Sequence, residues 1–326
     1  MLALFELANA EEYAANAVEL EVILQKCQQG RTTGAIQVSS PLRGDLQFLL
    51  SRGELISIQL QTHFDDGITG PESWKTMLDS SDAASVRVTP LPPLALRLAR
   101  LMAQSGQPVE KKIIEAIDLG SFLESWRSPL SLGLTFLGWA NAEAIMVLPS
   151  AGKSIRDAVL LTRNGNIELG SDAWQRALSN EDEQCIVNIF SGQSDSQAWL
   201  DFQLHLAFVS LSELLIARYE QFAGRILVNA MARDIAVTAE RGNWDIEVRG
   251  AIVEDWIFCR TPAEAASIYR EVLNVVRHHL GVVLGNRRVM TIMAESMASI
   301  PPPYHGLIQS YNLLPEALAS SGSGGH

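Results

Sequence analysis

Residues 196–240 are almost free of helix breakers, with Gly224 as the exception. A stretch of this length predicts long helices, because glycine and proline are the residues that most often end them. A second long helix is predicted from Pro262, since Thr261 can cap its first turn and Glu264 lies within that turn. This helical segment continues to about residue 300 and is expected to be interrupted near Gly281 and Gly285. The C-terminal part of the chain should therefore be dominated by long helices.

The remainder of the chain consists of short apolar segments separated by turn residues, which is typical of strands. Asn164-Gly165 is the strongest hairpin signal, because it lies between alternating apolar residues in the segment 158–170. Further strands are expected at 144–148, at 185–192, and as a pair within 244–259 that meets near Gly250. The whole pattern predicts an α+β protein.

The first 91 residues predict a small module in which a helix covers an antiparallel sheet. The helix is expected over 19–29, with Leu20, Ile23, Leu24 and Cys27 on one face. Strands are expected at 35–38, on both sides of a turn at Ser51–Glu54, and at 85–89, with a second helix at 72–79. The sequence Pro-Leu-Pro-Pro at 90–93 then ends the module.

Helices are expected next, at 94–105 and 110–127. The predicted organisation is a module at 1–91, a helical connector at 92–130, a mixed α+β region at 131–318 and a flexible tail at 319–326. The mixed region is expected to be one larger domain or two closely packed ones. No internal repeat with a period of 20–50 residues is evident. Strand hairpins followed by a long helix are compatible with a profilin-like or roadblock-like module, by analogy of pattern alone.

A short helix, the segment GRTTGAIQV at 30–38 and the segment GDLQFLLSRGELISIQL at 44–60 follow one another in the first module. This order resembles the N-terminal domain of cyanobacterial PatA-type response regulators, over about the first 90 residues. The matching residues are Thr33, Gly34, Ile36, Val38, Leu46, Phe48, Gly53, Leu55 and Ile56. Such modules have no assigned chemistry and accompany signalling domains, so the resemblance implies regulation rather than metabolism.

The acidic charge balance limits the classes of ligand. The chain has a formal net charge of −12, which disfavours binding to phosphate backbones, so no nucleic-acid partner is expected. No apolar run reaches the roughly 18–20 residues needed to span a bilayer, and the N-terminus lacks the basic region of a secretory signal. A cytoplasmic protein without membrane insertion is therefore expected, and Cys27, Cys185 and Cys259 should be reduced core residues.

No motif provides a complete catalytic or metal-binding set. Gly152-Lys153-Ser154 ends like a phosphate-binding loop, but Val147 stands where the first glycine is required. His278 and His279 are adjacent, and adjacent side chains point about 100° apart on a helix, so the two cannot share a metal ion. We therefore expect no enzymatic activity, no cofactor and no metal site.

Contact residues are predicted in both halves of the chain. Gln37, Gln47 and Gln59 place uncharged polar groups along the strands of the first module, and such groups lose water at lower cost than charges. Trp244 and Trp256 flank a strand pair and are candidate interface anchors, with core packing as the alternative. Self-association is predicted from the apolar residues of 262–299, with burial within the same chain as the alternative. These residues are Ile268, Val272, Val275, Val276, Val283, Val289, Ile292 and Met293.

The expected function is that of a non-enzymatic adaptor or scaffold in bacterial regulation or signalling, and by the resemblance in cyanobacteria. It would act through contacts with another protein. The alternative is a small-molecule sensor with a pocket in the region 130–260.

Overall fold

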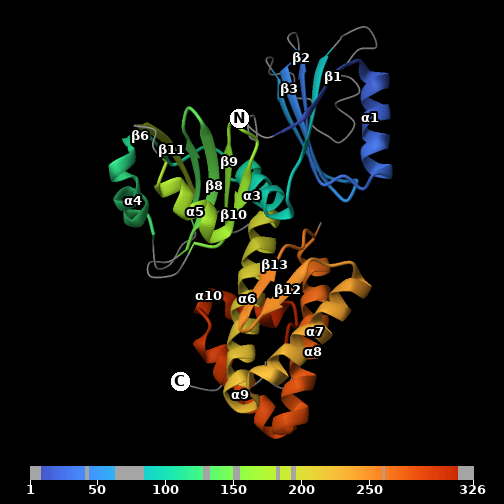
Figure 1. Ribbon diagram of the computed structural model, residues 1–326, viewed down its shortest axis with the longest axis vertical. Coiled ribbons are helices and arrows are strands. Elements are labelled where there is room, and N and C mark those ends of the chain that lie inside the picture. Colours follow the sequence, from blue (N-terminus) through green and yellow to red (C-terminus); the bar gives the residue numbers. More distant parts are fainter. Residues whose placement is uncertain are drawn as a thin grey trace. The chain divides into compact units, whose positions relative to one another are not determined.

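The computed structural model divides the chain into two compact units (Figure 1). Unit 1 is Met1–Gln193 and unit 2 is Ser194–His326, so the division falls inside the mixed region at 131–318. The structure describes residues 9–40, 44–62, 84–127, 133–149, 155–180, 184–191, 196–259 and 261–314. The predicted helix at 72–79, the segment 150–154 and the tail 319–326 lie outside these residues. Helices and antiparallel sheets in both units confirm the predicted α+β class.

The first sheet of unit 1 has five antiparallel strands in the order β1-β5-β2-β3-β4. The strands are β1 (Glu11–Ala15), β2 (Gly34–Ser40), β3 (Gly44–Ser51), β4 (Glu54–Thr62) and β5 (Ala84–Pro90). Helix α1 (Ala17–Gln29) covers one face, where Leu20 packs with Ile36, Val38 and Phe48. The predicted helix at 19–29 and the predicted strands at 35–38 and 85–89 are confirmed.

The turn between β3 and β4 has the predicted tight geometry. Arg52 and Gly53 both have positive φ, at 51° and 80°, which matches the two-residue turns that join twisted antiparallel strands. A side chain on Gly53 would also meet the carbonyl oxygen of Gln28 at 2.6 Å, so the turn is packed against the end of α1. This position therefore requires glycine for two separate reasons.

The second sheet of unit 1 has six antiparallel strands in the order β10-β9-β8-β7-β11-β6. The strands are β6 (Glu110–Glu115), β7 (Gly133–Gly138), β8 (Ala142–Leu148), β9 (Ala158–Thr162), β10 (Ile167–Leu169) and β11 (Gln184–Ser191). Helices α4 (Ala116–Ser125) and α5 (Gly170–Leu178) cover one face (Figure 1). The Asn164-Gly165 hairpin between β9 and β10 is confirmed.

The helix predicted over 110–127 is wrong in its first third. Residues 110–115 form β6, which pairs with β11 at the edge of the sheet, and only from Ala116 does the chain become helical. Pairing with a neighbouring strand here outweighs the modest helix propensity of Glu and Lys, which is a tertiary effect that local sequence does not record. The connector predicted at 92–130 is therefore not purely helical. Its helix α3 (Pro93–Gln104) contacts strands β2 and β3 of the first sheet and β8 and β9 of the second.

Unit 2 consists of helices around a short strand pair. Its elements are α6 (Gln197–Ala223), α7 (Arg225–Gly242), β12 (Ile246–Arg249), β13 (Ile252–Asp255), α8 (Pro262–Leu284), α9 (Asn286–Ser299) and α10 (Pro302–Ser310). The break at Gly224, the strand pair at Gly250 and the cap on α8 are as predicted: the Thr261 side chain accepts a hydrogen bond from the Glu264 amide. Helix α8 continues through Gly281 and ends before Gly285, and α10 has no counterpart in the sequence prediction.

Two helical hairpins in unit 2 are built alike. Helices α6 and α7 meet at Gly224 (φ 77°, ψ 166°), and α8 and α9 meet at Gly285 (φ 75°, ψ 152°), 61 residues later (285 − 224). The same shift relates positions that are buried in both hairpins: Leu204 and Ala265, Ala207 and Ile268, Phe208 and Tyr269, Leu211 and Val272, Leu215 and Val276, Tyr219 and Leu280, Val228 and Val289, Met231 and Ile292, and Ala239 and Ile300. Unit 2 therefore contains an internal structural repeat.

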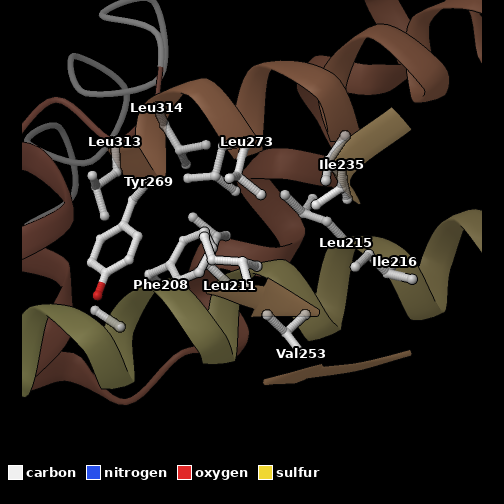
Figure 2. Close-up of a cluster of buried hydrophobic side chains, with 14 of the residues drawn as sticks. Phe208, Leu211, Leu215, Ile216, Ile235, Val253, Tyr269, Leu273, Leu313 and Leu314 are labelled. Atoms are coloured by element: carbon white, nitrogen blue, oxygen red, sulfur yellow. The ribbon is translucent and has the colours of Figure 1, made fainter. Parts of the chain in front are cut away.

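The core of unit 2 lies between these hairpins. The equivalent residues Phe208 and Tyr269 stack face to face, with ring centroids 4.1 Å apart and planes 7° apart (Figure 2). Leu211, Leu215 and Leu273 pack around them, together with Leu313 after α10. Within the described residues, α6 is the one helix long and apolar enough to cross a membrane. More than half of its most apolar segment is buried inside the protein. That burial is the behaviour of a core helix in a soluble protein.

Candidate functional site

The three glutamines predicted to bind a partner lie in one row across the first sheet. Gln37 on β2 pairs with Gln47 on β3, which pairs with Gln59 on β4. Gln47 is only 6% exposed, and Gln37 is half-buried, while the side chain of Gln59 lies outside the described residues. Helix α1 covers the opposite face of the sheet. Gln47 is thus enclosed by other residues of the chain.

The two tryptophans proposed as interface anchors are half-buried on unit 2. Trp244 packs against the core, and its ring lies so close to Gly242 that a Cβ there would meet it at 2.2 Å. Trp256 follows β13, and its amide donates a hydrogen bond to the carbonyl oxygen of Asp245. Trp244 therefore lies against its own unit, whereas only the backbone of Trp256 is tied to that unit.

The apolar residues that motivated self-association through the C-terminal helices are largely covered by the same chain. Ile268, Val272, Val276, Val289, Ile292 and Met293 belong to the core of unit 2, and Val275 packs against it. Val283 is the exposed member of the set. Burial within the chain, the alternative at the sequence level, accounts for the apolar pattern.

The residues that carry the resemblance to the PatA-type module have clear structural roles. The Thr33 hydroxyl accepts a hydrogen bond from the Arg52 amide, which ties β2 to the β3–β4 turn. A Cβ on Gly34 would meet the carbonyl oxygen of Thr89 at 2.2 Å, and Gly53 is packed against α1. These residues therefore hold the strands and the β3–β4 turn together, so packing of the module explains why they occur.

A buried polar cluster in unit 2 is an ionisable site that sequence reasoning did not find. Asp255, at the end of β13, accepts hydrogen bonds from His205 Nδ1 and from the Tyr269 hydroxyl, both at 2.6 Å. Its second oxygen accepts from the Ile257 amide at 2.9 Å. Because a carboxylate only accepts hydrogen bonds, His205 must carry its proton on Nδ1. His205 and Tyr269 lie 50 and 14 residues from Asp255 in the sequence, so no local spacing indicates the cluster.

The cluster joins α6, α8 and the segment after β13. The ring of His205 packs against Phe202, and the ring of Tyr269 stacks on Phe208, so aromatic side chains enclose the hydrogen bonds. A His–Asp pair can orient a general base, but nucleophilic catalysis requires an activated nucleophile within reach of that base. The described residues contain no group of three or more metal-ligating side chains. Because its hydrogen bonds join α6, α8 and the segment of Asp255, we assign the cluster a positioning role.

Unit 1 exposes an acidic surface on β1 and α1. Its members are Glu11, Tyr13, Val18, Glu19, Glu21 and Val22, all exposed. Among the described strands, β1 pairs only with β5, so its other side is a sheet edge. Glu19 also completes the capping box of α1 with Asn16, which explains its position in the first turn. The acidic surface thus combines negative charge, apolar side chains and an open strand edge.

Unit 2 exposes a surface of the opposite charge, which we call the corner surface. It lies where α6 meets α7 and α8 meets α9, and it consists of Phe222, Arg225, Ile226, Leu227, Val282, Val283, Arg287 and Arg288, all exposed. The two corners lie at the same end of the unit, because α6 and α8 run in the same direction (Figure 1). The ring contacts Phe208–Tyr269 and Tyr219–His279 establish this parallel register, and Arg288 of α9 lies over the ring of Phe222 of α6.

No family model matches the chain, and no curated protein is significantly similar to it. The fold and the two surfaces are therefore the basis for the functional proposals.

Proposed function

We propose that the protein is a non-enzymatic adaptor or scaffold in bacterial regulation, which acts in the cytoplasm through protein contacts. The observation that carries the proposal is the presence of two exposed, partly apolar surfaces of opposite charge on two separate compact units. An adaptor needs distinct surfaces for distinct partners, and charged surfaces with apolar centres give both selectivity and affinity. The resemblance of the first module supports a regulatory setting.

The acidic surface of unit 1 fits a basic, extended segment of a partner protein. The open edge of β1 offers backbone groups for strand addition, which supplies affinity without side-chain specificity. Glu11, on the α1 side of β1, and Glu21 would then select basic side chains, and Val18 and Val22 would lose water on contact. This surface replaces the glutamine row as the contact site of the first module.

A charge-reversal experiment tests the proposal. The variant Glu11→Lys/Glu21→Lys should retain about one tenth or less of the partner that the full-length protein captures from native lysate, because two complementary charges become repulsive. Quantitative mass spectrometry of the captured proteins measures this. The matched control is Glu240→Lys/Glu271→Lys, which changes the net charge equally at exposed positions of unit 2. Equal capture by both variants would contradict the proposal.

The sensor alternative gains no support from the pair of buried polar groups Thr135 and Asn188. Thr135 and Asn188 each bury a side-chain atom without a hydrogen-bond partner among the described residues of the second sheet. However, Asn188 pairs with Phe136, the neighbour of Thr135, so the two side chains point to opposite faces of the sheet. Unpaired groups on opposite faces do not converge on one ligand.

A further inference from the structure

The corner surface concentrates exposed aliphatic side chains at one end of unit 2. Ile226, in the first turn of α7, is 83% exposed, and Val282, in the last turn of α8, is 73% exposed. Phe222, Leu227 and Val283 are exposed beside them. Single exposed apolar residues are ordinary on protein surfaces, but five at two adjacent helix corners form a patch that indicates a binding surface.

The corner surface is basic in a chain that is acidic as a whole. Arg225 is the first residue of α7, and Arg287 and Arg288 lie in the first turn of α9, whereas the chain carries a net charge of −12. Gly224 and Gly285 precede these helices without a side-chain cap, so the first backbone N–H groups also point to this end. The guanidinium of Arg288 lies 4.9 Å from the centroid of the Phe222 ring, which holds a cation and an apolar ring together.

The exposure of these side chains distinguishes between possible occupants. Ile226 and Val282, at 83% and 73%, are too exposed to line a groove. A folded partner would need a matching hollow, and a nucleic acid would gain little from projecting Ile and Val side chains. The interface of a bilayer accepts such side chains among its headgroups, and anionic headgroups attract the arginines that surround them.

We propose that the corner surface docks unit 2 on a membrane rich in anionic phospholipid. Ile226 and Val282 enter the region between headgroups and acyl chains, while Arg225, Arg287 and Arg288 bind lipid phosphates. None of the described helices crosses the bilayer in this arrangement, because α6, the one long and apolar enough to do so, stays in the core of the unit. This inference is independent of the partner proposed for unit 1, since the two surfaces lie on different units.

Vesicle co-sedimentation of the full-length protein tests the proposal. The protein should sediment with vesicles of phosphatidylcholine containing about 30% phosphatidylglycerol, and it should remain in solution with pure phosphatidylcholine. Arg287→Gln/Arg288→Gln should weaken partitioning by about 25-fold, from about five-fold for each charge near the surface. Ile226→Ser/Val282→Ser should weaken it by more than about ten-fold, because the inserted apolar area is lost.

Matched variants separate docking from misfolding and from general charge effects. Arg163→Gln/Arg241→Gln removes two exposed arginines elsewhere, and Ile117→Ser removes an exposed aliphatic side chain from α4; both should bind vesicles as the wild type does. Circular dichroism should give the same spectrum for all variants. The proposal is overturned if the wild type stays in solution with the anionic vesicles, or if the corner variants bind them as tightly as the matched variants. Salt-dependent self-association without vesicle binding would assign the corner surface to a second copy of the chain instead.

Discussion

The carboxylate of Asp255 accepts hydrogen bonds from groups that come from α6, from α8 and from its own segment. Its side chain is fully buried, so water does not replace a partner that is removed. An isolated buried carboxylate is costly, whereas one with several donors can be stable in the interior. Asp255 therefore fixes how the strand pair of unit 2 is attached to the two long helices.

We expect Asp255→Ala to lower the free energy of unfolding of unit 2 by about 3–5 kcal/mol, because His205 and Tyr269 lose their shared acceptor. Tyr269→Phe should cost about 1 kcal/mol, since one hydrogen bond is lost and the stacked ring remains. Urea titrations monitored by circular dichroism measure both changes. Glu271→Gln, at an exposed position of α8, is the control and should change little. Equal stability of Asp255→Ala and this control would contradict the positioning role.

Burial raises the pKa of the Cys185 thiol to about 12. The neutral thiol therefore stabilises the folded state fully below the unfolded pKa, near 9, and this contribution is lost as pH rises through about 12. At pH 8 the native thiol should resist alkylation, because the thiolate is the reactive form. Iodoacetamide labelling read by mass spectrometry should modify Cys185 slowly in native protein and rapidly in urea. Rapid native labelling would show that β11 opens far more often than a core strand should.

Sequence reasoning succeeded where the signal was local and failed where it was not. The turn at Gly53, the Asn164-Gly165 hairpin and the Thr261 cap are each specified by neighbouring residues, and each has the predicted geometry. The Asp255 cluster joins residues that are far apart in the sequence, so only the fold brings them together. The acidic and corner surfaces depend on which apolar residues the core leaves uncovered, which periodicity alone does not determine.

At the scale of elements, the two glycine corners define unit 2. Both glycines combine a φ near 75° with an extended ψ, a region of the backbone map that other residues essentially do not occupy. This conformation reverses the chain within a single residue. It lets α7 and α9 return along α6 and α8 and bury the matching residues of the repeat.

We expect Gly224→Ala and Gly285→Ala each to lower the free energy of unfolding by about 1–3 kcal/mol through backbone strain. A Cβ at either position would meet nothing within 4 Å, so the cost comes from φ and not from a clash. The control is Gly306→Ala in α10, where a Cβ also meets nothing within 4 Å and φ is not positive. That change should stabilise by about 0.5–1 kcal/mol. Thermal unfolding curves distinguish the opposite signs, and stabilisation by all three substitutions would refute the argument.

Strand β6 shows why a strand can be predicted as a helix from sequence alone. Its six residues have no alternation of apolar and polar side chains, and they precede a true helix. Hydrogen bonds to β11, about 70 residues later, decide the outcome. Contacts between segments that are distant in the sequence also define the boundary between the two units.

At the scale of the whole molecule, each unit has cores of its own. The clusters under α1 and under α4 and α5 contain only residues of unit 1, and the cluster between the helical hairpins contains only residues of unit 2. Residues that pack in one core tend to unfold in one cooperative transition. Units with cores of their own can therefore unfold in separate transitions.

We expect scanning calorimetry to resolve two transitions. Leu215→Ala should lower the stability of unit 2 by about 2–5 kcal/mol, because it leaves a cavity in the core, and it should shift one transition only. Val86→Ala in the first sheet should shift the other transition. If both substitutions moved the same transition by similar amounts, the chain would unfold as a single cooperative body.

The internal repeat of unit 2 has a consequence for how its stability depends on concentration. A lone helix–glycine–helix hairpin would leave its apolar stripe open and would need a second copy to cover it, as in a symmetric dimer. Joining both hairpins in one polypeptide makes that association intramolecular, so it survives at any dilution. It also frees the halves to differ: a dimer carries every substitution twice, whereas here Ala266 stands at the position equivalent to His205, and Phe208 at that of Tyr269. A symmetric homodimer would carry the cluster of His205, Asp255 and Tyr269 twice or not at all. Two hairpins joined in one chain can carry it once.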